Sequence, residues 1–342
     1  MRSARDLLER ATAGASHHDT IEFGPIPLRI STESPDEWSD IARRLFNGAP
    51  RWPNLHVVSV TDATIPITDF PTEFRLLGDR VVVTDLGDVK IIASGLEQSI
   101  WVLDRSSATA MRWGRDDEDV TPWERASPLR SAACWWSAES GGAFVHAAAV
   151  SSETGALLLV GQSGAGKSTT SLSCLGSELD VLGDDFCFVE PPTLSHGALV
   201  HAAYRLGKLD DRALDLMPHL ATRSAGDGPR GKTLIELDDV ARSHQTISAV
   251  CHVVQDPTAP THVRPISRIG ALRSVAPSTL LHVRPLDERT FRTLTAVIRS
   301  VPSFQLSVND LQCVPTVLSE LLAALGDSRR LGPPTATAGA LT

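Results

Sequence analysis

The sequence has few cysteines and no paired ones. Its five cysteines, at positions 134, 174, 187, 251 and 313, are odd in number and widely scattered, and none belongs to a C-x-x-C pair. This pattern resembles neither a disulfide framework nor a structural zinc site. We therefore expect free, buried thiols in a reducing compartment.

Long hydrophobic runs are also missing. The longest apolar stretches, such as Ala156 to Val160, have the length of a strand, whereas a membrane helix needs about 18 or more apolar residues. The first residues, Met1 to Asp6, lack the apolar core of a secretory signal. We expect a cytoplasmic protein with no membrane-spanning segment.

Positive charge is in deficit. Lys and Arg number 32 against 41 Asp and Glu, which gives a net charge of −9. Such a surplus of acid repels the phosphate backbone, so we do not expect nucleic acid as a partner. The 42% hydrophobic and 21% charged residues are typical of a globular protein and exclude a disordered or fibrous chain.

The chain of 342 residues is longer than one hydrophobic core usually supports. Its residue pattern differs between an N-terminal and a C-terminal stretch. Residues 1–130 mix short strand-like runs, turn-forming residues and a helical stripe, which predicts an N-terminal α+β domain. Residues 131–330 alternate apolar runs with glycine-rich turns, which predicts an α/β nucleotide-binding domain with a mixed sheet. The acidic run 115–119 is expected to be a solvated loop, and residues 331–342 a flexible tail. Strands are expected at 55–60, 80–84, 90–93, 143–150, 156–160, 181–182, 186–189 and 301–308, and helices at 36–46, 169–175 and 314–325.

One glycine-rich segment gives the most specific chemical signal. Gly161 to Ser168 matches G-x-x-x-x-G-K-[ST] at every fixed position, after an apolar run and before a run compatible with a helix. Glycines let backbone N–H groups turn toward an anion, Lys167 adds positive charge, and the Ser168 hydroxyl can ligate Mg²⁺. The alternative is a chance glycine-rich turn. The predicted ATP-binding residues here are Gly161, Gln162, Ser163, Gly164, Ala165, Gly166, Lys167, Ser168 and Thr169.

A pair of adjacent carboxylates follows this segment. Sixteen residues separate Lys167 from Asp184-Asp185, so the first helix leads almost directly into a short strand that carries the pair. One carboxylate can bind the metal, and the other, with its proton affinity raised by its neighbour's charge, can accept a hydroxyl proton. A solvated Asp-Asp turn is the alternative. We predict Asp184 and Ser168 as metal ligands.

A histidine precedes the glycine-rich segment. His146 lies in the apolar run 143–150, which residues 151–155 join to the apolar run 156–160. Five residues are too few for a crossover helix, so we expect an antiparallel hairpin. Alternation along the first strand places His146 on the opposite face from its two neighbours. A histidine on an apolar strand can simply be a core residue, but the motifs downstream favour a site residue.

Together, Val145 to Ala147, the hairpin, Gly161 to Ser168 and Leu182 to Asp185 resemble the catalytic domain of HPr kinase/phosphorylase. They resemble still more closely the HPr-kinase-like proteins that bacteria carry beside peptide-modification genes. The resemblance covers residues 145–190 and, more loosely, the chain to about residue 325. It implies the P-loop fold shared with the ATP-dependent phosphoenolpyruvate carboxykinases.

The resemblance also implies roles for individual residues. By motif, Asp185 is the base toward a seryl hydroxyl, and Asp184 supports the metal. Lys167 and Ser168 hold ATP and Mg²⁺, and His146 lies beside the transferring phosphate. The expected catalytic residues are therefore Asp185, Asp184, His146 and Lys167, with the assignment within the Asp pair left open.

The chain departs from this family further downstream. We find no glycine-rich signature of the kind that serves phosphorolysis, so the resemblance does not extend to that activity or to HPr as acceptor. The segments Tyr204 to Leu209 and Gly228 to Lys232 resemble the kinase-like relatives instead. Within them, the cations that can face phosphate are Arg205, Lys208 and Lys232, each of which could equally be a surface cation.

These observations favour an ATP- and Mg²⁺-dependent kinase that phosphorylates a serine-type hydroxyl of a peptide or protein. A natural-product precursor peptide is the leading acceptor on the resemblance alone. One alternative is a kinase of a small hydroxylated metabolite, such as free serine or a sugar. Another is a nucleotide-binding regulatory protein without transfer activity. The sequence leaves the oligomeric state open, a homo-oligomer included.

Overall fold

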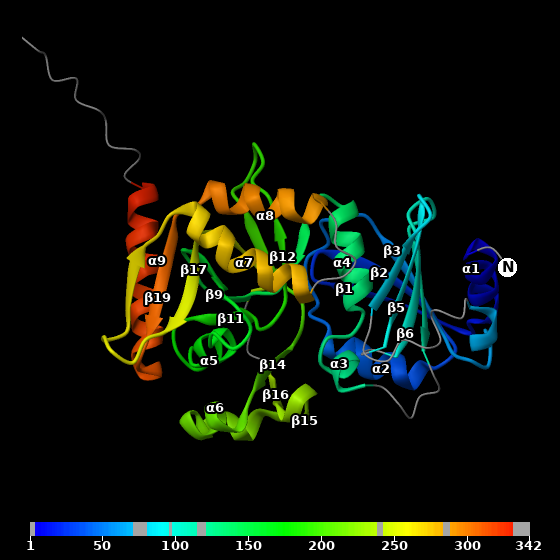
Figure 1. Ribbon diagram of the computed structural model, residues 1–342, viewed down its shortest axis with the longest axis horizontal. Helices are drawn as coiled ribbons and strands as arrows, with labels where there is room; N and C mark the ends of the chain where they lie inside the picture. Colours follow the sequence, from blue (N-terminus) through cyan, green and yellow to red (C-terminus); the bar gives the residue numbers. More distant parts are fainter. Residues whose placement is uncertain are drawn as a thin grey trace, which may run out of the picture.

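The described part of the chain consists of residues 4–70, 81–95, 98–114, 121–237, 242–282 and 288–330 of a computed structural model. Two large β-sheets lie side by side, each with helices packed against it, and a small third sheet lies along the lower edge of one of them (Figure 1). This is a mixed α/β fold. The loop expected at 115–119 and the tail expected at 331–342 lie outside the described residues.

The N-terminal sheet is formed by β1 (His17–Phe23), β2 (Ile26–Thr32), β3 (Leu55–Val60), β4 (Val81–Asp85), β5 (Val89–Ser94), β6 (Ser99–Asp104) and β7 (Thr109–Gly114). Their order is β1-β2-β3-β7-β6-β5-β4. β2, β3 and β7 run parallel, and the remaining neighbours are antiparallel. The strands expected at 55–60 and 90–93 are confirmed; of the run expected at 80–84, the described part lies in β4.

Alternation along β3 gives this sheet two apolar faces. Leu55 and Val57 join one core cluster with α2 (Pro35–Arg44), whereas Val58 and Val60 join another with α1 (Ala4–Gly14). The helix expected at 36–46 is therefore confirmed, and one helix covers each side of the sheet.

The second sheet contains β8 (Ala143–Val145), β9 (Ala148–Ser152), β10 (Gly155–Val160), β11 (Asp180–Gly183), β12 (Cys187–Glu190), β13 (Leu199–Ala202), β17 (His244–Gln255), β18 (His262–Pro265) and β19 (Ser303–Val308). Its main order is β11-β9-β10-β17-β13-β12-β8, and β19 pairs with both β17 and β18. β17 runs parallel to β10 and β19, and the other pairs are antiparallel. The expected hairpin is confirmed, because β9 and β10 pair from Ser152 opposite Gly155.

Helices cover both faces of this sheet. Leu157 and Leu159 of β10 pack in a cluster with α5 (Lys167–Leu172) and α9 (Val314–Arg330). Leu158 and Val160 point the other way and pack in a cluster with α7 (Arg268–His282) and α8 (Glu288–Ser300). β10 is thus buried on both sides, which fixes the position of the glycine-rich segment at its end.

A small sheet of β14 (Leu206–Leu209), β15 (Ser224–Asp227) and β16 (Thr233–Glu236) lies beside α6 (Asp211–Leu216) at the bottom of Figure 1. β16 is the middle strand and pairs antiparallel with both others. No helix in the described ranges is long and apolar enough to cross a membrane.

The two large sheets share a core at the expected domain boundary. The chain passes through α3 (Pro122–Ala126) into α4 (Arg130–Glu139), which lies between the sheets (Figure 1). Trp135 of α4 belongs to one buried cluster with Trp101 of the N-terminal sheet and Phe188 of the second sheet. A helix that connects the two sheets therefore begins at residue 130, and the two sheets share buried residues there.

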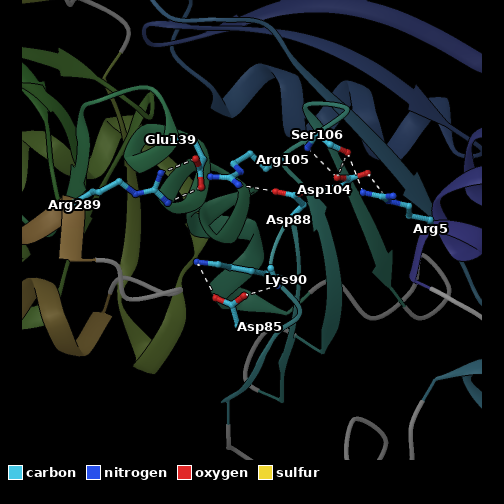
Figure 2. Close-up of polar contacts among 10 residues, drawn as sticks. Arg5, Asp85, Asp88, Lys90, Asp104, Arg105, Ser106, Glu139 and Arg289 are labelled. Atoms are coloured by element: carbon cyan, nitrogen blue, oxygen red, sulfur yellow. Dashed lines mark hydrogen bonds and ion pairs between the residues drawn. The ribbon is translucent and has the colours of Figure 1, made fainter.

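Ion pairs reinforce this junction. Arg289 of α8 donates two hydrogen bonds of 2.6 Å to the Glu139 carboxylate at the end of α4 (Figure 2). Arg105, in the turn between β6 and β7, pairs with Asp88 at 2.6 Å, and its charge also interacts with Glu139. Charges from the N-terminal sheet, α4 and α8 thus meet at one place.

Candidate active site

The glycine-rich segment forms a turn between the buried strand β10 and the short helix α5. Gly164 and Gly166 have φ values of +83° and +93°, in the left-handed region that favours glycine. A Cβ atom on Gly164 would meet nothing within 4 Å, whereas one on Gly166 would lie 3.0 Å from the Gln255 Nε2 atom. The turn therefore presents bare backbone toward open space on one side and contacts the end of β17 on the other.

Lys167 lies inside this turn. Its side chain is buried, and its Nζ donates to the carbonyl oxygens of Gly161 at 3.0 Å and Gln162 at 3.2 Å. Burial lowers the pKa of Lys167, while the charges of Asp185 and Asp184 act in the opposite direction. The positive charge of Lys167 is thus held within the glycine-rich turn, where the sequence motif predicts that a phosphate binds.

Asp184 follows β11 and is almost completely buried, with 1% of its surface exposed. Its Oδ2 accepts the backbone N–H of Lys208 at 2.9 Å, and its carboxylate is hydrogen-bonded to the Ser168 side chain. Burial, followed by the charge of Asp185, raises the pKa of Asp184, and the hydrogen bonds only reduce this effect. The Asp184 carboxylate therefore lies within hydrogen-bond distance of the Ser168 side chain, which comes directly after Lys167.

Asp185 is in the left-handed region, with φ of +68°. Its Oδ1 lies 2.9 Å from His146 Nε2, and its Oδ2 forms an ion pair with Lys208 Nζ. Burial opposes ionisation of Asp185, but the charge of Lys208 and the hydrogen bond from His146 outweigh it and hold the pKa well below its usual range. The pKa values of the two carboxyl groups are driven in opposite directions.

This result corrects one expectation about the base. The sequence suggests that the neighbouring charge raises the proton affinity of the base, whereas in the structure Asp185 has the lowered pKa and Asp184 the raised one. The reason is Lys208, which comes from a different sheet and neutralises Asp185. Asp185 is consequently ionised at neutral pH.

His146 is placed by a break in the strand rather than by alternation. The expected strand 143–150 divides into β8 and β9, which pair with different neighbours, and His146 lies in the bend between them. Its backbone N–H donates to Thr279 Oγ1 at 3.3 Å. Burial lowers the pKa of His146, although Asp185 opposes this. Since the ionised Asp185 can only accept, His146 Nε2 carries the proton in their hydrogen bond.

These side chains surround one cleft of about 120 Å³. Its lining residues are His146, Ser163, Gly164, Gly166, Lys167, Ser168, Thr169, Asp185, Lys208, Asp210, Lys232 and Gln255. The structure therefore brings together the histidine, the glycine-rich segment, one of the two aspartates and two of the three downstream cations that the sequence singles out.

Gln255 and Asp210 were missed in the sequence. Asp210 accepts the backbone N–H of Ala213 at 2.9 Å and so caps α6, and its position before a helix is a signal that the sequence does contain. Gln255 ends β17 and belongs to no motif, so only the parallel pairing of β10 with β17 brings it to the cleft.

Arg205 is not brought to the cleft. Its Nε donates to the carbonyl oxygen of Leu45 at 3.3 Å, and its guanidinium lies 5.3 Å from the centre of the Phe46 ring. Its backbone N–H also bonds to the Arg44 carbonyl, at 2.9 Å. Arg205 therefore joins the small sheet to the end of α2 instead of facing a phosphate.

A second, larger cavity of about 500 Å³ adjoins the cleft. The two share Gly164, Gly166, Thr169, Asp210 and Gln255. The larger cavity is also lined by Thr170, Arg212, Ala213, Leu216, Pro257, Val308, Asn309 and Leu311. Its lining contains both apolar and polar side chains, which is typical of pockets that bind small molecules.

The residues present fit a magnesium ion only together with a phosphate ligand. No group of three or more His, Cys, Asp or Glu side chains in the described ranges could hold a metal alone. Ser168 and Asp184 provide two adjacent oxygens, joined by a hydrogen bond. Mg²⁺ is commonly bound in this way, by one or two protein oxygens plus water and substrate phosphates.

Comparisons with known proteins give a distant structural likeness. No protein-family model matches the chain, and no curated protein does. Among solved structures, the chain is similar to the HPr(Ser) kinase/phosphatase from Coxiella burnetii, with 14% sequence identity and a TM-score of 0.30. The match covers 53% of this chain and 97% of that one. The site is therefore interpreted from its own geometry.

Proposed function

We propose that this protein is an ATP- and Mg²⁺-dependent kinase that transfers the γ-phosphate to a serine-type hydroxyl of a peptide or protein. The observation that carries the proposal is the single cleft in which Lys167 and Ser168 face an ionised carboxylate, Asp185. A phosphate site and a proton acceptor across one small space are what phosphoryl transfer to an alcohol needs.

The two cavities divide the nucleotide between them in this proposal. The cleft, which Lys167 lines, takes the phosphates, and the adjoining cavity takes the nucleoside. Ser168 and Asp184, which are hydrogen-bonded to each other, would hold Mg²⁺, and the ion would neutralise phosphate charge when bound. Gly164, whose Cβ position is open space, allows the backbone to approach the anion closely.

Asp185 acts as the base. Its carboxylate is ionised and is fixed at both oxygens, by His146 Nε2 on one and Lys208 Nζ on the other. It accepts the proton of the acceptor hydroxyl as the oxygen attacks. Lys167 and Lys232, which both line the cleft, supply positive charge around the transferred group.

The proposal is tested by following the label from γ-³²P-ATP in the presence of Mg²⁺. The full chain is incubated with a panel of synthetic serine-containing peptides, with free serine and simple sugars, and with no acceptor. Label on a peptide is the expected result, and label on a small molecule would change the acceptor class. Release of inorganic phosphate alone, with or without acceptors, would contradict the kinase assignment.

A further inference from the structure

Lys208 holds both carboxylates of the candidate site in place. Its Nζ pairs with Asp185 Oδ2, and its backbone N–H donates to Asp184 Oδ2 at 2.9 Å. Its side chain is only 5% exposed, and its Nζ lies 5.8 Å from the centre of the Phe186 ring. A buried ammonium group needs hydrogen-bond acceptors for its protons, so the position of Lys208 depends on what accepts from it.

Ser127 supplies one of these acceptors from outside the motifs. Lys208 Nζ donates to Ser127 Oγ at 3.2 Å, and Ser127 is 2% exposed. The serine lies between α3 and α4, in the segment that connects the two large sheets. The N-terminal part of the chain therefore borders the candidate catalytic residues through this segment.

The segment around Ser127 is held firmly. The Ser127 N–H donates to the Trp123 carbonyl oxygen at 3.1 Å, and the next carbonyl, of Pro128, accepts the Tyr204 hydroxyl at 2.9 Å. The N–H of Leu129 then donates to Glu124 Oε1 at 3.3 Å. Contacts on both sides of Ser127 thus fix where its hydroxyl lies.

Glu124 connects this segment to the N-terminal sheet. Its Oε1 lies 3.3 Å from Arg112 Nε, and the two side chains are 1% and 6% exposed. Arg112 is on β7 and also donates to Ser59 Oγ of β3, at 3.3 Å. A buried ion pair of this kind has a defined geometry, because leaving either charge without a partner would be costly.

We propose that Ser127 is a positioning residue that orients Lys208 and, through it, Asp185, and that the N-terminal sheet fixes Ser127 through Arg112 and Glu124. This inference rests on the proposed function for its catalytic meaning. It gives the N-terminal part of the chain a role in the reaction, because the sheet then sets the geometry of the base.

The test measures the chemical reactivity of the Lys208 amine in the full-length protein. Trace labelling with acetic anhydride, quantified by mass spectrometry, reports how accessible and how nucleophilic an amine is, and both should rise when a hydrogen bond that holds the amine is lost. Ser127→Ala should raise the labelling of Lys208 by about tenfold, because one charged hydrogen bond is lost. Ser127→Thr keeps the hydroxyl and should restore low reactivity. Glu124→Gln, which weakens the attachment to Arg112, should also raise it.

Ser137→Ala is the matched control. Ser137 is equally buried and its Oγ donates to the Cys134 carbonyl oxygen at 2.9 Å, within α4 and away from Lys208. It should leave the labelling of Lys208 unchanged. Circular dichroism identifies any variant that does not fold, and Ser127→Cys, with similar volume and a weak acceptor, replaces Ser127→Ala in that case.

The catalytic part of the inference is measured separately. Ser127→Ala should lower kcat for transfer about tenfold and leave the Kd for ADP unchanged, since Ser127 does not line the nucleotide cavities. If Ser127→Ala and Ser127→Cys leave Lys208 as unreactive as in the parent protein, the inference is wrong. If the parent protein transfers phosphate to no acceptor, the proposed function fails, while the labelling still decides whether Ser127 positions Lys208.

Discussion

His146 and Asp185 come from different strand ends and meet at 2.9 Å, with the histidine nitrogen donating to the carboxylate. The same carboxylate is paired with Lys208 on its other oxygen. Asp185 thus has one oxygen fixed by a neutral donor and one by a cation. Removing its charge should therefore remove the proton acceptor and also leave the buried Lys208 ammonium without its charged partner, which lowers stability.

Asp185→Asn should bind ATP normally and lose about 10² to 10⁴ in transfer rate, the usual contribution of a positioned base. Asparagine also tolerates the positive φ at this position, so the backbone should be retained, with a lower thermal stability because the buried Lys208 loses its charged partner. Turnover with labelled ATP and nucleotide titration separate the two effects. Asp215→Asn, at an exposed position on α6, is the control. Near-normal turnover of Asp185→Asn would remove the base from the mechanism.

Lys167→Ala should weaken the binding of ADP and ATP roughly tenfold or more, because the buried ammonium would no longer face the phosphates. Isothermal titration with ADP and Mg²⁺ measures this directly and needs no acceptor. Arg43→Ala removes an exposed cation on α2 and should have no effect. An unchanged Kd in Lys167→Ala would show that the phosphates bind elsewhere.

Gly166→Ala and Gly176→Ala form a matched pair. Both glycines have a positive φ, +93° and +83°, so alanine introduces similar backbone strain of about 1 kcal/mol at each. Only Gly166 has a neighbour at its Cβ position, Gln255 Nε2 at 3.0 Å, whereas Gly176 has nothing within 4 Å. We expect similar losses in thermal stability but a loss of ADP binding in Gly166→Ala alone. Equal ADP affinity in the two variants would contradict the assigned phosphate turn.

Stability should fall in acid because of Glu190. The carboxylate accepts from Arg51 at 2.8 Å and lies 2.8 Å from His201 Nε2. Burial opposes ionisation of Glu190, but His201 and Arg51 outweigh it and lower its pKa to about 2. As the pH falls, Glu190 therefore takes up a proton in the unfolded chain before it does so in the folded chain. The stabilisation that Glu190 provides is complete above about pH 4.5 and is lost toward pH 2. The total loss in the free energy of unfolding is on the order of 3 kcal/mol.

Denaturant unfolding at pH 7 and pH 3 measures this dependence. Glu190→Gln should be less stable than the parent at pH 7, because Arg51 loses its charged partner, and should lose less stability between the two pH values. An equally steep pH dependence in Glu190→Gln would assign the acid sensitivity to other groups.

The local parts of the site could be predicted from the sequence. The turn from Gly161 to Ser168 and the hairpin before it depend on residues close together in the chain, and both have the expected form. The strand at the Asp pair is also where it was expected, as β11. Short-range backbone preferences determine these features, so a single sequence contains enough information for them.

The long-range parts could not be predicted. Lys208 does line the cleft, but nothing in the sequence predicts that the small sheet places its ammonium against Asp185. Ser127 and Gln255 carry no motif at all, and they reach the site only through the packing of α3 and the pairing of β17. Side-chain pairing between separate sheets depends on the whole fold, which periodicity and spacing do not encode.

The aromatic cluster that contains Trp101, Trp135 and Phe188 limits how a bulky acceptor can enter. Swinging the two large sheets apart would bring these rings into contact with water, and each ring would lose a large buried apolar area. A hinge motion that separates the two sheets is therefore disfavoured. An acceptor of the proposed kinase should therefore reach the cleft while the two sheets stay packed against each other.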